Sequence, residues 1–254
     1  MTALPHRLDR TIVIEAPRAL VFEFFTDNDR WSDWWGSGST IDPRPGGRVV
    51  IRYPNGVVVS GEVVEAVAPD RIVFTYGFES GQPIAAGTSL VTIRLAPHGA
   101  GTSLSLTHEF AEAKVRDEHV QGWRYQLSVF GNVVANRLHA GAADLIDRWH
   151  EAWSDTNAET RSLSLAAVAH PDVRFRDRFS LVDGLADLAP HIGAYQYFMP
   201  GIAIKRVGEI RHCQGTVLAE WAATSADGQP RGNGTNVFVM GADGKIASVT
   251  GLWR

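Results

Sequence analysis

The chain has 254 residues, of which 44% are hydrophobic and 20% charged, and its net charge is −4. This length fits two domains of ordinary size, and this composition is that of a globular chain rather than a disordered one. No cluster of Lys and Arg supplies the basic surface that nucleic acid or an anionic membrane requires, so we expect neither as a partner.

Features linked to export and to membranes are missing from the sequence. Asp9 and Arg10 stand where an export signal needs an apolar run. No stretch approaches the ~20 apolar residues of a membrane-spanning helix. The single cysteine, Cys213, has no partner for an internal disulfide, which suits a reducing compartment. We therefore expect a cytoplasmic protein.

The first half of the chain predicts a sheet followed by one long helix. Residues 11–15 predict a strand, and helical patterns follow as far as Trp35. Alternating hydrophobicity then predicts paired strands from Arg48 to Phe110. From about 114 to 139, apolar residues recur every three and four positions, which predicts a helix with one continuous apolar face. This face consists of Val120, Trp123, Leu127, Phe130, Val134 and Leu138.

A second helix-and-sheet pattern begins near Ala143. Leu145, Ile146, Trp149 and Trp153 predict the apolar face of a first helix. A second helix is predicted to end at His170-Pro171, followed by a short strand at Val173 and Phe175 and a third helix over residues 184–198. Four further strands are predicted over residues 202–212, 216–224, 234–240 and 246–253. We therefore predict two α+β domains, residues 1–140 and 141–254, each with a mainly antiparallel sheet curved around helices.

Five motifs of the first half occur in a characteristic order over residues 8–139. They are Ala16-Pro17 with Val21-Phe22, Trp31 with Trp34-Trp35, Pro45-Gly46-Gly47, Gly61-Glu62-Val63, and His119-Val120-Gln121-Gly122-Trp123 with Leu127. In this order they resemble the SRPBCC (START/Bet v 1-like) superfamily, in its Hsp90-ATPase-activator-homologue branch. The resemblance implies a helix-grip fold, in which a curved antiparallel sheet holds the long C-terminal helix with a cavity between them.

A looser pattern runs through residues 143–254. Its motifs are Arg148-Trp149, Pro171-Asp172-Val173-Arg174-Phe175 with Asp177, Gly184, the strand from Gly234 to Val239, and Gly244-Lys245-Ile246 with Leu252-Trp253. The pattern resembles the NTF2-like superfamily, in the SnoaL polyketide-cyclase and ketosteroid-isomerase branch. The resemblance implies a cone-shaped α+β barrel.

The same resemblance implies roles for three residues of the second half. In the steroid isomerases, an aspartate at the place of Asp177 is the proton-shuttling base. A tyrosine at the place of Trp149 and a carboxylic acid at the place of Asn236 form the oxyanion hole. Here Trp149 donates only through its indole N–H and Asn236 through its amide, so a steroid-isomerase activity is not expected unchanged. A related proton transfer remains compatible with these residues.

Two interpretations of Asp177 stay open. Because Asp177 follows the apolar strand Val173–Phe175, it can be a carboxylate at a cavity mouth that takes a proton alpha to a carbonyl. Because it lies between Arg176 and Arg178, it can instead be a surface aspartate paired with an arginine.

The other candidate ligand contacts are mostly aromatic. In the second half, Trp153, Trp221, Phe238 and Trp253 either wall a cavity or form ordinary core. Asn236, Phe238 and Met240 share one strand phase. In the first half, the strand phase directs His108 and Tyr76 to the concave side of the sheet, and Trp123 from the long helix is the third expected contact. His108 is either a polar anchor in that cavity or a histidine at a strand end, and His191 is expected to be exposed or part of the core.

Motifs for cofactors and metals are absent. His108-Glu109 and His150-Glu151 lack the second histidine of the zinc-binding HExxH motif. The sequence also has no paired-cysteine motif, phosphate-binding loop or nucleophile elbow. We therefore expect no cofactor and no metal.

Three functional hypotheses follow. The first is a cofactor-free cyclase or isomerase that acts on a small apolar or aromatic carbonyl compound, with Asp177 as base. The second is a non-enzymatic ligand-binding or Hsp90-activator-like protein. The third is an NTF2-like epoxide hydrolase, for which Arg211 and Glu220 are the nearest partners of Asp177. Both faces of the strand over residues 217–223 carry apolar residues, so we also expect a homodimer.

Overall fold

The computed structural model describes residues 3–254. The chain divides into two compact units, with the boundary between Ala135 and Asn136. Each unit combines helices with its own curved sheet, which confirms the predicted α+β class. Within the described residues, no helix has both the length and the apolar character needed to span a membrane.

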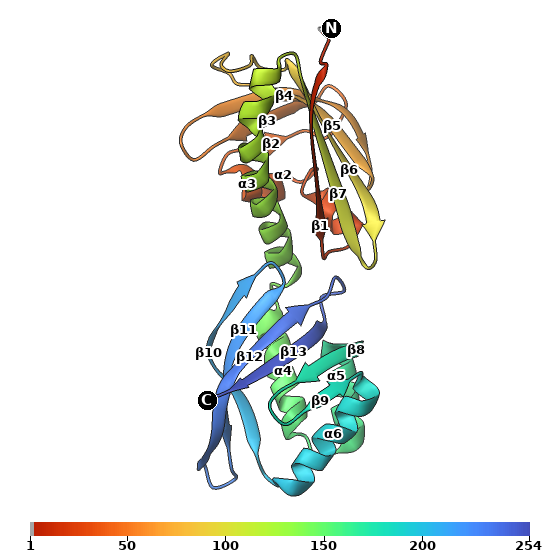
Figure 1. Ribbon diagram of the computed structural model, residues 1–254, viewed down its shortest axis with the longest axis vertical. Helices are drawn as coiled ribbons and strands as arrows, with labels where there is room; N and C mark the ends of the chain where they lie inside the picture. Colours follow the sequence, from red (N-terminus) through yellow and green to blue (C-terminus); the bar gives the residue numbers. More distant parts are fainter. Residues whose placement is uncertain (1–2) are drawn as a thin grey trace. The chain divides into compact units, whose positions relative to one another are not determined.

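The N-terminal unit is a seven-stranded antiparallel sheet in the order β1-β7-β6-β5-β4-β3-β2. The long helix α3 (Ala113–Leu138) lies against this sheet and buries Trp123, Leu127 and Phe130, as its apolar spacing predicts (Figure 1). The other elements are β1 (His6–Ile14), α1 (Arg18–Glu23), α2 (Asn28–Trp35), β2 (Thr40–Ile41), β3 (Arg48–Arg52), β4 (Val58–Val67), β5 (Arg71–Tyr76), β6 (Ser89–His98) and β7 (Gly101–Phe110).

The first strand begins earlier than the sequence pattern predicts. It starts at His6, which pairs with Phe110, and not at residue 11. Arg7 and Asp9 point outward and form an ion pair, with 2.7 Å between the Arg7 guanidinium and an Asp9 carboxylate oxygen. These polar residues hide the strand from a search for apolar runs, although Leu8 between them is buried.

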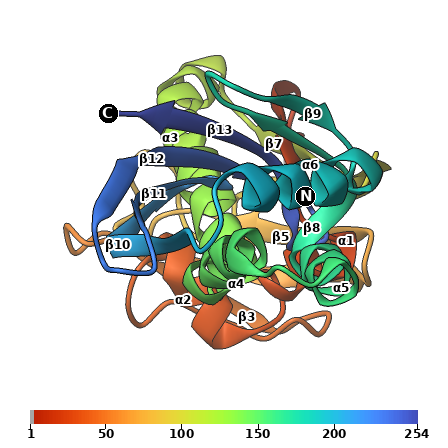
Figure 2. The same ribbon diagram turned by 90° about the horizontal axis from the view of Figure 1, so that it is seen from below.

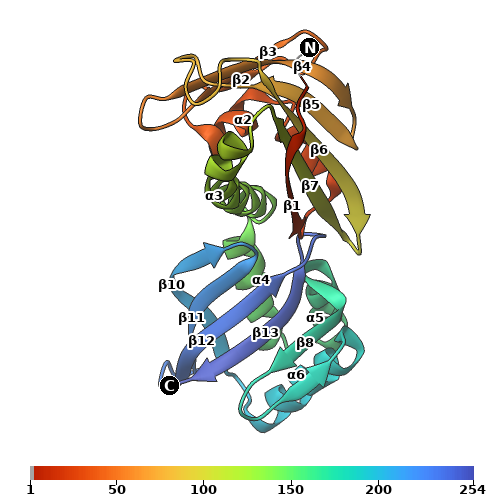
Figure 3. The same cartoon turned by 45° about the horizontal axis from the view of Figure 1, so that its top comes forward.

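The C-terminal unit has a six-stranded sheet in the order β10-β11-β12-β13-β8-β9 (Figure 3). Only β13 and β8 pair in parallel, and β10 and β9 are open edges, so the sheet curves without closing into a barrel. Its elements are α4 (Ala142–Ser154), α5 (Ala158–Val168), β8 (Ala169–Arg176), β9 (Leu181–Asp183), α6 (Leu185–Phe198), β10 (Ala203–Cys213), β11 (Thr216–Thr224), β12 (Pro230–Met240) and β13 (Ile246–Trp253).

The sequence predicts that Pro171 separates a helix from a later strand, but the structure places this proline differently. Helix α5 ends at Val168 and β8 begins at once at Ala169, so Pro171 lies inside the strand. The ladder between β8 and β13 is irregular between the pairs of Ala169 and Arg174. Pro171 lies in this irregular stretch, where the N–H that proline lacks is not required.

The three helices of the C-terminal unit gather on one face of its sheet (Figure 2). Helix α4 packs its predicted face against the sheet and fully buries Ile146 and Trp149. Helix α6 buries Leu188 and Ile192 in the same core. The packing leaves a hollow between α4, α6 and the inner face of the sheet, where the candidate site lies.

Candidate functional site

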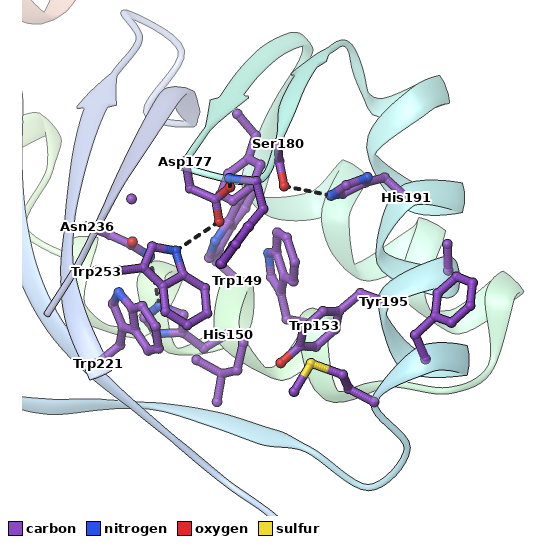
Figure 4. A pocket seen from close by; sticks show the side chains of 17 residues that line it. Trp149, His150, Trp153, Asp177, Ser180, His191, Tyr195, Trp221, Asn236 and Trp253 are labelled. Carbon is purple, nitrogen blue, oxygen red and sulfur yellow. Dashed lines mark hydrogen bonds between the residues drawn. The ribbon is translucent and has the colours of Figure 1, made fainter. Parts of the chain in front are cut away.

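A cavity of about 490 Å³ opens in the C-terminal unit (Figure 4). Its wall is mainly apolar and aromatic, and only a few polar groups reach it. The aromatic wall includes Trp149, Trp153, Phe175, Phe179, Tyr195, Trp221 and Trp253, and the polar groups are His150, Asp177, Ser180, His191 and Asn236. This combination of a large apolar wall and a few polar groups is typical of small-molecule sites.

Asp177 reaches the cavity because of where β8 ends. Val173 and Phe175 are buried, and the alternation of the strand directs Asp177, the first residue after it, to the same side. One Asp177 carboxylate oxygen accepts a hydrogen bond of 2.8 Å from the backbone N–H of Phe179. The other accepts one of 3.1 Å from the indole N–H of Trp253. Asp177 is half-buried, and no arginine in residues 3–254 forms an ion pair with it.

A glycine brings Asp177 close to Asn236. In the sheet, Asn236 on β12 pairs with Gly251 on β13, and Thr250 pairs with Arg176, which places Gly251 beside Asp177. A Cβ atom at Gly251 would lie 3.1 Å from the Asp177 Cβ and 3.2 Å from the Asn236 side-chain oxygen. The missing side chain at 251 therefore leaves the carboxylate and the amide as neighbours on one patch of the cavity wall.

His150 is a cavity residue that the sequence interpretation missed. It is 2% exposed, and the Asn236 amide donates a hydrogen bond of 3.4 Å to its Nε2. The ring hydrogen is therefore on Nδ1, which is buried and has no partner in the part of the chain that the structure describes. Burial lowers the pKa of His150 to about 4, so the ring is neutral at pH 7. The spacing in the sequence does indicate this position, because His150 follows Ile146 by four residues and precedes Trp153 by three. It therefore lies on the apolar face of α4.

Three of the four tryptophans in the wall keep an unused hydrogen-bond donor. The indole nitrogens of Trp149, Trp153 and Trp221 are buried and have no partner within the described residues. The fourth, Trp253, donates to Asp177. A buried donor without a partner costs about 1–3 kcal/mol.

Two further polar residues of the cavity wall interact with each other, one from the turn after β8 and one from α6. Ser180 and His191 share a hydrogen bond of 3.0 Å, and both line the cavity, where His191 is half-buried. Tyr195 also lines the cavity, and burial raises the pKa of its hydroxyl. Tyr197, which follows on the same helix, is 81% exposed and points away.

Three residues considered in the sequence lie outside this cavity. Phe238 shares the inward phase of Asn236, but it is fully buried behind the wall, where its ring meets Trp149 edge to face at 6.3 Å. Arg211 is exposed. The Glu220 carboxylate pairs with Arg254 at 2.6 Å.

The N-terminal unit holds a smaller cavity, of about 150 Å³, lined by Tyr76 and Trp123 among others. His108 lies behind this wall and is fully buried. Its Nδ1 accepts a hydrogen bond of 2.9 Å from the indole N–H of Trp123, so Nε2 carries the hydrogen and donates to the Ser89 hydroxyl at 2.8 Å. Burial lowers the pKa of His108 well below its usual value. His108 is therefore a neutral, fully bonded core residue and not a free anchor.

No group of three or more His, Cys, Asp and Glu in residues 3–254 is placed to hold a metal ion. The carboxylate, imidazole and amide groups of the large cavity are the groups available for chemistry. They can accept a proton, donate hydrogen bonds and orient a ligand.

Comparison with known proteins supports the resemblance seen in the first half of the sequence. Residues 15–135 match the family model described as "Activator of Hsp90 ATPase homolog 1-like protein". This match confirms the resemblance of the first half, and the N-terminal unit has the helix-grip arrangement which that resemblance implies. A comparison with curated proteins gives no match.

Several solved structures are similar to parts of the chain. A putative isomerase of the SnoaL-like family from Agrobacterium tumefaciens is 21% identical, with a TM-score of 0.43, over 46% of this chain and 98% of that one. CalU16 from Micromonospora echinospora is 27% identical, with a TM-score of 0.42, over 49% and 73% of the two chains. The Aha1 dimer from Colwellia psychrerythraea is 16% identical, with a TM-score of 0.41, over 48% and 90%. Since these TM-scores are below 0.5, none of the three similarities supports a function for this chain.

Proposed function

We propose that the C-terminal unit is a cofactor-free isomerase or cyclase that moves a proton alpha to a carbonyl in a small, flat, apolar or aromatic compound. The observation that carries this proposal is the carboxylate of Asp177, which faces an aromatic cavity without a basic partner. The walls supply an apolar surface for the body of the ligand, as a polyketide-like or steroid-like skeleton requires.

The proposed reaction begins with proton transfer to Asp177. The carboxylate takes a proton from the carbon next to the carbonyl. The electron pair of the broken C–H bond forms the new C=C bond, and the π pair of the carbonyl moves onto its oxygen. The resulting enolate oxygen receives hydrogen bonds from the indole N–H of Trp149 and the amide of Asn236. Asp177 then returns the proton to another carbon. In the cyclase reaction the enolate carbon instead attacks a second carbonyl and closes a ring, and Asp177 gives its proton to the resulting alkoxide oxygen.

The neighbouring groups hold Asp177 in position for this step. The bonds from Trp253 and from the Phe179 backbone fix the carboxylate orientation, and catalysis depends strongly on such orientation. The neutral His150 accepts from Asn236 and so fixes the amide. Because the ring stays neutral, it adds no charge that would neutralise Asp177.

The test is alpha-proton exchange followed by NMR in deuterated water, with a panel of cyclic ketones and β-dicarbonyl compounds. Asp177→Asn keeps the shape of the side chain and removes the base, so exchange should fall by about 10²–10⁴-fold while ligand affinity changes little. Asp172→Asn is the matched control, because Asp172 lies on the same strand with a side chain that is 93% exposed. Equal exchange rates in the Asp177→Asn variant and the parent protein would rule out Asp177 as the base.

A second candidate function is ligand binding without chemistry. The observation in its favour is that both carboxylate oxygens of Asp177 already accept a hydrogen bond. A protein of this kind would bind the same panel and exchange no protons, with or without Asp177→Asn. The family match of residues 15–135 adds a partner of the Hsp90 type to this candidate, which an Hsp90 ATPase assay with and without the purified chain would test.

The epoxide-hydrolase hypothesis receives the least support. That chemistry needs an arginine between two carboxylates in one cavity, whereas the described residues that line the large cavity include no arginine. Arg211 and Glu220 also lie elsewhere on the unit.

Homodimerisation and a cytoplasmic location remain part of the proposal. The outer face of β11 presents the half-buried residues Leu218 and Ala222, a small apolar surface for a second copy. Light scattering over a wide concentration range tests this expectation, and a constant monomer mass would contradict it. Cell fractionation tests the location.

A further inference from the structure

A second hollow adjoins the large cavity of the C-terminal unit. It has a volume of about 360 Å³ and shares Asp177, Gly251 and Trp253 with the large cavity. We call it the arginine vestibule; its other lining residues are Arg176, Arg178, Thr250 and Leu252. Asp177 and Trp253, whose hydrogen bond Figure 4 shows, therefore line both spaces.

The two arginines of the vestibule are free of carboxylate partners. Both side chains are exposed, and neither forms an ion pair within residues 3–254. The chain elsewhere pairs several exposed arginines, as at Arg44 with Asp42 and Arg254 with Glu220. The vestibule thus presents positive charge that the protein itself does not neutralise.

Aromatic rings hold one of these charges in place. The Arg178 guanidinium carbon lies 4.5 Å from the centre of the Phe179 ring and 5.4 Å from that of the Trp253 ring. Cation–π contact of this kind restricts a side chain that would otherwise move freely in solvent. A guanidinium stacked by its face keeps its N–H edge available, and that edge matches the two oxygens of a carboxylate or phosphate.

We propose that the arginine vestibule binds an anionic oxygen group, a carboxylate or a phosphate, on a ligand whose flat apolar body occupies the large cavity. The Arg178 guanidinium lies against the Phe179 and Trp253 rings, which also line the large cavity, so the anionic group of a ligand bound in that cavity would reach Arg178 at this rim. Two guanidinium groups outweigh the single carboxylate of Asp177, so the vestibule attracts an anion despite that neighbour. The inference rests on the proposed ligand cavity, and it does not depend on Asp177 acting as a base.

The experiment compares two fluorescent dyes that share one aromatic body. Anilinonaphthalene sulfonate carries an anion, and phenylnaphthylamine is its neutral counterpart. The double variant R176Q/R178Q should weaken binding of the sulfonate dye about tenfold, the equivalent of about 1.4 kcal/mol for a charged hydrogen bond. Binding of the neutral dye should stay within about twofold. Added salt should weaken only the sulfonate dye, because exposed charges are screened.

Arg174→Gln is the matched control. Arg174 is exposed on the same strand as Arg176, but it does not line the vestibule. The R174Q substitution changes the net charge by the same amount as a single vestibule variant. If R174Q weakens the sulfonate dye as much as R178Q does, the effect is one of overall charge and the proposal is wrong. Equal affinity of the parent protein and R176Q/R178Q for the sulfonate dye would also overturn it.

Two further measurements locate the dyes and identify the anion. Ala194 lines the large cavity from α6, so Ala194→Trp should obstruct both dyes; if neither dye weakens, no aromatic body occupies the cavity and the proposal fails. Displacement of the sulfonate dye by naphthoate, naphthyl phosphate and methyl naphthoate then separates the two anions. The ester should compete at least tenfold less well than the better anion, and equal competition by all three would contradict an anion site. Because every readout is binding, loss of catalysis in an Asp177 variant leaves these results unaffected.

Discussion

The buried pair of Trp123 and His108 should make a measurable contribution to the stability of the N-terminal unit. In the variant Trp123→Phe, Nδ1 of His108 loses its only donor, at present 2.9 Å away. His108 is fully buried, and a buried acceptor left without a donor costs about 1–3 kcal/mol. The variant also loses packing, which a control substitution has to remove from the comparison.

Trp35→Phe provides that control. Trp35 and Trp123 are both 4% exposed and line the same small cavity, but the indole nitrogen of Trp35 has no hydrogen-bond partner among residues 3–254. The same atoms are removed at both positions, so the hydrogen bond is the principal difference between the two variants. We expect Trp123→Phe to lower the free energy of unfolding by about 1–3 kcal/mol more than Trp35→Phe does.

Urea unfolding followed by circular dichroism measures the difference, and hydrogen exchange of the amides in β7 and α3 assigns it to this unit. The local measurement is needed because a chain with two units need not unfold in a single transition. A Trp35→Phe variant that is destabilised as much as Trp123→Phe would refute the reasoning. The conclusion would then be that packing, and not the hydrogen bond, accounts for the burial of His108.

Three other substitutions give direct outcomes. Gly251→Ala puts a methyl group 3.1 Å from the Asp177 Cβ and 3.2 Å from the Asn236 oxygen, so alpha-proton exchange should fall about 10–100-fold as the two groups are pushed apart. His139 is buried, and neither ring nitrogen has a hydrogen-bond partner among residues 3–254. Burial lowers the pKa of His139 to about 4, so the unfolded chain binds the proton more readily and stability is lost as pH falls from about 6.5 toward 4. In acid titrations of thermal stability, His139→Leu should therefore lose less stability than the parent protein, without cost at neutral pH. Gly131→Ala should stabilise α3 by about 0.5–1 kcal/mol in urea unfolding, because the added methyl meets no atom within 4 Å.

The periodic parts of the fold were predictable from the sequence. The alternation that directs Asn236 and Met240 inward is seen in their burial, and the apolar spacing of α3 places Trp123 and Phe130 against the sheet. Periodicity, however, reports which side of an element is buried and not whether the space beside it is filled. For this reason Phe238 has the inward phase of a cavity residue and is nevertheless core.

Polar residues within apolar faces were harder to interpret. His150 lies on the buried face of α4 and His108 on the buried face of β7, and sequence alone treats both as polar residues in an apolar pattern. The difference between them depends on distant partners. Trp123 and Ser89 satisfy both nitrogens of His108, whereas His150 has one nitrogen bonded to Asn236 and the other without a partner among the described residues. No local pattern contains this information.

The position of Asp177 beside Asn236 also depends on a pairing that no local signal specifies. β8 joins the sheet in parallel with β13, although about seventy residues separate the paired positions Arg176 and Thr250. That pairing places Asp177, Gly251 and Asn236 in one row across three strands, and only a residue without a side chain at 251 lets the outer two approach. An antiparallel addition of β8 would direct its end, and with it Asp177, to the other end of β13. The proposed base is therefore defined by the one parallel pair of this sheet, and its chemistry follows from the topology as much as from the residue itself.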